Sequence, residues 1–156
     1  MNGRNTQMKK FKLLFWALLL GMIVIQFIRP ARNTSGQAPA QSFIDTFKLD
    51  DSIRKVLTAS CFDCHSNNTR YPWYANIQPV GWVMSGHIRN GKEKLNFDDV
   101  ASYGPRKRKS KFREIKEQIE QDKMPLPSYK ILHKDARLTV DQKNILLHWF
   151  ENLSNN

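Results

Sequence analysis

Residues 61–65 read Cys-Phe-Asp-Cys-His, and the chain of 156 residues contains no other cysteine. Two thiols three positions apart on one helical turn can each add to a vinyl group of a porphyrin, and the imidazole that follows then lies under the iron. A CxxCH sequence is therefore typical of c-type haem attachment. We expect one covalently bound haem c, with Cys61 and Cys64 as its attachment sites and His65 as a ligand of its iron.

Two other kinds of site use paired cysteines. A redox-active dithiol usually lies in a βαβ unit, which this sequence does not predict. A zinc site needs a second pair of ligands, and these would have to be histidines because the chain has no further cysteine. The sequence therefore favours haem over both alternatives.

A six-coordinate haem iron needs a second axial ligand, for which the folded part of the chain offers Met84, Met124, His87, His133 and His148. Met124 lies in the sequence KMPLPSY, where two prolines restrict the backbone and could present the sulfur at a fixed distance. The other candidates lie beside apolar stripes of predicted helices or in a loop. We expect Met124 to be the ligand, with His87 as the next candidate and an open position as a further alternative.

A membrane segment precedes the folded part. Residues 13–28 read LLFWALLLGMIVIQFI, with no charge and one polar side chain, Gln26. The stretch is slightly shorter than the roughly 20 residues that span a bilayer, but flanking Lys12 and Arg29 can snorkel to the headgroups. The small-x-small sequence at residues 38–40 lies too far along for a signal peptidase site, so we expect an uncleaved single-pass anchor.

The distribution of basic residues orients this anchor. More of them precede the apolar segment than follow it, which places the N-terminus in the cytoplasm and the C-terminal domain in the periplasm of a bacterium. We expect a cytoplasmic N-terminus (1–12), an anchor in the cytoplasmic membrane (13–28), a flexible tether (29–42) and a haem-binding domain (43–156). The tether assignment rests on its Pro, Ala, Ser and Gln content.

Helical spacing of apolar residues predicts an all-α domain. Five helices are expected. The first covers residues 50–60, the second runs from Pro79 to about Gly91, and the third begins at Asn96. The fourth covers 110–122, and the last begins at a capping box of Thr139 and Gln142. Long loops are expected at 66–79 and 123–138. No alternating pattern typical of a strand occurs.

Two further segments have both a structural and a functional interpretation. The aromatic residues of Tyr-Pro-Trp-Tyr (71–74) could form a haem wall, with Arg70 as the partner of a propionate, or could simply pack in the core. The basic run at 106–116 is typical of a solvated helix face, or could dock an acidic redox protein or anionic lipid. The domain that carries it is expected outside the cytoplasm, so we expect no nucleic acid partner.

Four stretches of the chain together resemble a known family. CFDCHSNNTRYPWYANIQPVGW, HIRNGKEKLNF, KMPLPSY and ARLTVDQKNILLHWF are similar to the haem-binding domain family of c-type cytochromes, which are membrane-anchored in bacteria, over residues 43–153. The resemblance implies a cytochrome-c-like helical fold, covalent haem at Cys61 and Cys64, and His65 and Met124 as iron ligands. His87 also occupies a featured position of the family, whereas Lys123 stands where glycine often precedes the Met-Pro pair.

These observations predict an electron carrier and not an enzyme. With His and Met as ligands, a haem iron can change its charge without losing a ligand, and no catalytic residue is needed. Its partners would be redox proteins at the membrane surface and, through residues 13–28, the lipid bilayer. The alternatives are a haem peroxidase, in which His87 would face an open iron position, and a haem-based sensor or accessory subunit.

Overall fold

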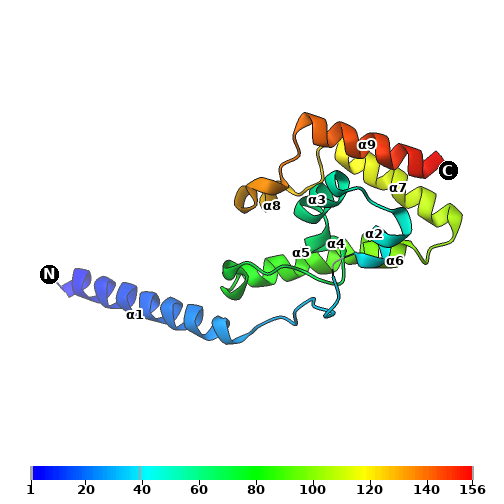
Figure 1. The fold of residues 1–156 in the computed structure, drawn as a ribbon. Coiled ribbons are helices and arrows are strands. Elements are labelled where there is room, and N and C mark those ends of the chain that lie inside the picture. The colour runs from blue at the N-terminus through cyan, green and yellow to red at the C-terminus, as the bar shows by residue number, and fades with distance from the viewer. Residues whose placement is uncertain (1, 39, 156) are drawn as a thin grey trace. The chain divides into compact units, whose positions relative to one another are not determined.

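The computed structural model describes residues 2–38 and 40–155, and every regular element in these residues is helical (Figure 1). This confirms the predicted all-α class. The chain forms two compact units. One consists of the chain up to Arg32 together with Tyr71–Gly86, and the other of Asn33–Arg70 and the chain from His87 onward.

The first unit contains the long N-terminal helix. Helix α1 (Asn2–Val24) continues as a short 3₁₀ helix, η1 (Ile25–Phe27). The stretch Gln7–Phe27 has a mean hydropathy of 1.8 and none of it is buried, so this helix is long and apolar enough to cross a membrane. The 3₁₀ helix η2 (Trp73–Asn76) and the beginning of α5 (Val80–Lys94) complete the unit.

The second unit is built from short helices around an aromatic core. Besides the C-terminal half of α5, its elements are α2 (Gln41–Phe47), α3 (Asp51–Ser60), α4 (Phe62–His65), α6 (Phe97–Val100), α7 (Pro105–Glu120), α8 (Pro127–Leu132), the 3₁₀ helix η3 (Lys134–Ala136) and α9 (Val140–Asn155). Helices α7 and α9 pack side by side (Figure 1). The largest fully buried side chains of the core are Phe43, Phe62, Phe97, Phe112, Phe150, Leu57 and Leu146.

Side-chain caps fix where several helices begin. Asp50 accepts a hydrogen bond from the Ile53 amide of α3 (2.9 Å), and Asn96 accepts one from the Asp98 amide of α6 (3.2 Å). Before α9, the Gln142 side chain accepts from the Thr139 amide (2.9 Å), and the Thr139 hydroxyl accepts from the Gln142 amide (3.2 Å). This reciprocal pair confirms the predicted capping box.

Some predicted boundaries were wrong. The helix expected at 110–122 runs from Pro105 to Glu120, and a proline suits the first turn of a helix. Lys107 lies over the Tyr103 ring and Arg108 over the Phe47 ring. The helix expected to end near Gly91 continues to Lys94. The expected loop at 123–138 contains α8 and η3, and the loop at 66–79 contains η2.

Candidate functional site

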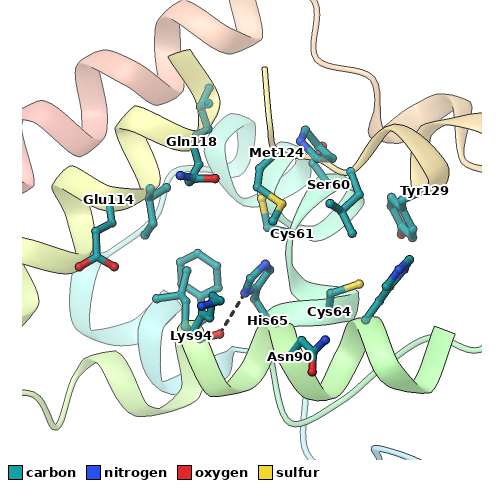
Figure 2. Close-up of a pocket in the computed structure, with 18 of the residues that line it drawn as sticks. Ser60, Cys61, Cys64, His65, Asn90, Lys94, Glu114, Gln118, Met124 and Tyr129 are labelled. Atoms are coloured by element: carbon teal, nitrogen blue, oxygen red, sulfur yellow. Dashed lines mark hydrogen bonds between the residues drawn. The ribbon is translucent and has the colours of Figure 1, made fainter. Parts of the chain in front are cut away.

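One cavity of about 580 Å³ in the second unit brings the predicted site residues together. It is lined by Cys61, Cys64, His65, Met124 and His87, among others, and Figure 2 shows the first four around one space. The volume lies within the roughly 300–1,000 Å³ that cofactor sites occupy. Residues from α4, the second half of α5, and the segment before α8 therefore converge on a single site.

The remaining candidate ligands do not line this cavity. Met84 belongs to the other unit. The exposed His148 ring lies 3.2 Å from the Asn152 amide nitrogen. The ring of His133 stacks on Tyr129, with centroids 4.0 Å apart. Of the methionines and histidines that the sequence offers as a second axial ligand, the cavity thus retains Met124 and His87.

His65 is held in the orientation that suits an iron ligand. Its Nδ1 lies 3.0 Å from the Leu95 carbonyl oxygen, so the tautomer that donates from Nδ1 leaves Nε2 with a free lone pair. Burial lowers the pKa of His65, although the carbonyl groups of Leu95 and Gly91 oppose this shift. A histidine that ligates a metal usually donates its other ring N–H to a carbonyl or carboxylate in this way.

Gly91 allows α5 to lie against the CxxCH turn. A Cβ atom at position 91 would lie 2.7 Å from the Cys64 carbonyl oxygen and 3.4 Å from His65 Cε1. Only glycine fits this approach without a shift of the backbone. In the sequence, the only sign of this close approach is a glycine inside a helical pattern, and the expected helix instead ends at about Gly91.

The two thiols do not have the properties of a redox dithiol. Both cysteines are free. Burial raises the pKa of Cys61 to about 12 and that of Cys64 to about 11, with a smaller contribution from a neighbouring negative charge in each case. Reactive dithiols instead have lowered pKa values. In the described residues 2–38 and 40–155, no group of three or more His, Cys, Asp or Glu side chains could hold a metal ion.

A buried carboxylate inside the CxxCH sequence organises the wall of the site. Asp63 Oδ1 accepts hydrogen bonds from the Arg70 amide (3.1 Å) and Arg70 Nε (3.0 Å). Asp63 Oδ2 accepts from Arg70 Nη2 (3.0 Å) and from the Tyr129 hydroxyl (2.8 Å). Arg70 also donates to the Thr58 carbonyl (2.8 Å). The guanidinium of Arg70, which the sequence offers as a possible partner of a propionate, thus pairs with Asp63 in the structure.

Tyr129 is a site residue that the sequence did not single out. It lines the cavity, and burial together with the negative charge of Asp63 raises the pKa of its hydroxyl. The predicted haem wall at residues 71–74 belongs to the other unit, where Trp73 is 75% exposed. The aromatic side chains that line the cavity, apart from its histidines, are Phe97 and Tyr129.

Charged residues line another part of the cavity. Lys94 and Lys111 contribute to the lining, together with Glu114, and Lys111 Nζ lies 2.7 Å from Glu114 Oε2. Figure 2 shows Lys94 and Glu114 on the side opposite Cys64. The site therefore combines apolar and aromatic walls, two thiols, a histidine with a free nitrogen, and lysines, which suits an iron porphyrin with two carboxylates.

Comparison with known proteins agrees with this fit. The model of a haem-binding domain family matches the chain over residues 20–152. Searches of curated proteins and of solved structures found no significant match. Because the family match covers most of the chain, as the resemblance in sequence predicted, the protein belongs to the haem-binding domain family and haem is its cofactor.

Proposed function

We propose that the protein is a membrane-anchored monohaem c-type cytochrome that carries single electrons on the periplasmic side of the cytoplasmic membrane. The observation that carries this proposal is the convergence of Cys61, Cys64, His65 and Met124 on one cavity of cofactor size. These four residue types are the attachment and ligand set of a six-coordinate c-type haem.

Each of these residues has a defined part in holding the group. Cys61 and Cys64 would hold the haem through thioether bonds, and His65 would bind its iron through Nε2. The hydrogen bond from His65 Nδ1 to Leu95 fixes the ring and increases its basicity as a ligand. Met124 would be the second ligand of the iron, and the haem would supply one-electron chemistry, whose potential a thioether ligand raises.

The charged part of the cavity suits the propionates of the haem. Haem carries two propionates, and Lys94 lines the cavity on this side, whereas Lys111 is already paired with Glu114. We assign the propionates to this side. An Nζ donor to a carboxylate is a charge-assisted hydrogen bond and is stronger than a neutral one.

The proposal requires no catalytic residue, and the chain is not an enzyme in this account. The alternative functions, a peroxidase or a sensor, would depend on His87, because it lines the same cavity as Met124. If the iron lacked the Met124 ligand, His87 could act as the distal acid or base of a peroxidase, or could bind the iron itself in a sensor.

The ferric absorption spectrum of the purified protein and two variants distinguishes these ligand sets. We expect the weak near-infrared band of sulfur-to-iron charge transfer in the wild type and in His87→Ala, and its loss in Met124→Ala. Loss in His87→Ala with retention in Met124→Ala would contradict Met124 as the ligand. Faster peroxide turnover in the wild type than in His87→Ala would favour the enzyme.

The membrane assignment has its own test. A membrane-spanning helix resists high salt, because screening weakens charge attraction and not apolar insertion. The protein should remain in the membrane fraction after a high-salt wash and keep its N-terminal residues by mass spectrometry. A mature chain that begins near Gln41 would instead indicate a cleaved signal peptide, and the electron-transfer proposal would then concern a soluble cytochrome.

A further inference from the structure

We propose that residues 71–83, the interface segment, lie in the lipid headgroup region and insert apolar side chains into the bilayer beside the end of the anchor. This inference rests on the proposed membrane anchor. It assigns a lipid-binding role to an aromatic segment that the haem site does not use.

A reciprocal pair of hydrogen bonds joins the interface segment to the anchor. Gln26 Nε2 donates to the Gln78 carbonyl (3.1 Å), and the Gln78 amide donates to Gln26 Oε1 (2.9 Å). Gln26 is the one polar side chain in the apolar stretch 13–28. The backbone of the interface segment therefore satisfies the Gln26 side-chain amide. Gln26 and Gln78 lie together at the C-terminal end of the anchor.

The last residue of the anchor and Arg32 of the tether also contact the interface segment. Trp82 Nε1 donates to the Ile28 carbonyl (2.8 Å). Arg32 Nη2 donates to Asn76 Oδ1 (2.6 Å), and the Arg32 guanidinium lies 4.9 Å from the centre of the Tyr71 ring. These contacts all lie within one compact unit, so the anchor and the interface segment are placed together.

The interface segment exposes several large apolar side chains. Trp73 is 75% exposed and Val83 is 56% exposed, and the segment also exposes Ile77, Val80 and Trp82. Residues 71–86 contain no charged side chain, although charged residues make up 25% of the chain. Insertion of this surface into a membrane interface therefore removes no charge from water.

The bilayer is the apolar phase that adjoins the end of a membrane-spanning helix. Trp and Tyr concentrate at this level, because their rings combine an apolar body with a polar group. Basic residues next to the segment, Arg29 and Arg32, favour the anionic headgroups of a bacterial membrane. Lipid therefore fits the composition, the exposure and the position of the interface segment.

Photolabelling of the full-length haem protein tests this inference. The protein is reconstituted in vesicles of phosphatidylethanolamine and phosphatidylglycerol that contain a phospholipid with a diazirine in its acyl chain, and mass spectrometry maps the adducts. We expect adducts on the anchor and on residues 71–83. Ile131 and Leu132 are the internal control, because they are 68% and 60% exposed but belong to the other unit. They should carry background label.

The possible labelling patterns distinguish failure of the interface segment from failure of the membrane anchor. A labelled anchor with residues 71–83 at the level of Ile131 and Leu132 would overturn the inference and leave the anchor in place. An unlabelled anchor would overturn both. In the labelled case, Trp73→Ser with Val83→Ser should reduce the adducts on 71–83 severalfold without changing those on the anchor, and Ile131→Ser with Leu132→Ser should change neither. Unreduced adducts in the Trp73 and Val83 double variant would contradict the assignment of these side chains.

Discussion

Replacement of Gly91 by alanine tests the packing of α5 against the CxxCH turn. The added Cβ atom would lie 2.7 Å from the Cys64 carbonyl oxygen, whereas ordinary contact begins at 3.4 Å, so the backbone would have to move by about 0.7 Å. Overpacking of this kind costs about 1–3 kcal/mol. The upper half of that range applies, because a backbone carbonyl cannot rotate away.

The gain in helix propensity offsets part of this cost. Alanine is more favourable than glycine in a helix interior by about 1 kcal/mol. The expected net effect of Gly91→Ala is therefore a loss of about 1–2 kcal/mol in the free energy of unfolding. Gly86→Ala is the matched control, because Gly86 lies in the same helix and a Cβ there would meet no atom within 4 Å. It should not destabilise the protein.

Guanidinium unfolding of the haem-loaded protein in detergent, followed by visible haem absorbance, measures both effects. The new Cβ would also lie 3.4 Å from His65 Cε1, so Gly91→Ala should alter the electron paramagnetic resonance spectrum of the ferric iron as well. A Gly91→Ala variant as stable as Gly86→Ala, with an unchanged spectrum, would refute the argument that glycine is needed here.

Two further predictions concern the carboxylate network and the basic run. In chemical unfolding, Asp63→Asn should destabilise the protein by about 2 kcal/mol, because it weakens every hydrogen bond that the buried carboxylate accepts. Tyr129→Phe should cost about 1 kcal/mol, because it removes one of these hydrogen bonds. Equal losses in the two variants would contradict this order. If the basic run at 106–116 docks an acidic redox partner, replacement of Arg106 and Lys107 by Glu should slow electron transfer, measured by stopped flow. Added salt should slow electron transfer by the wild type, since charges are screened beyond about 10 Å at 0.1 M salt. A rate that ignores both changes would leave the run as a solvated helix face.

The sequence predicted those features that depend on neighbours along the chain. The CxxCH spacing, the Met-Pro turn and the capping box of Thr139 and Gln142 are all local, and the structure places the first two around one cavity and forms the third. Helix content was also predictable, because apolar spacing reports the face that a helix buries.

Features that depend on distant residues were missed. Tyr129 bonds to Asp63 across 66 positions, and no periodicity links the two. Gly91 matters only because the Cys64 carbonyl lies against it. The aromatic residues at 71–74 could form a haem wall or pack in the core, but none of them lines the haem cavity: Tyr71 contacts the Arg32 guanidinium, and Trp73 is exposed.

Extraction of the denatured protein with acidified organic solvent tests the central claim most directly. Two thioether bonds to Cys61 and Cys64 hold the haem whether or not the chain is folded, so the haem absorbance should remain with the polypeptide, and the polypeptide mass should exceed that of the bare chain by one haem. Replacement of both cysteines by alanine should abolish this retention. Complete transfer of haem from the wild-type protein to the organic phase would contradict covalent attachment at the CxxCH sequence.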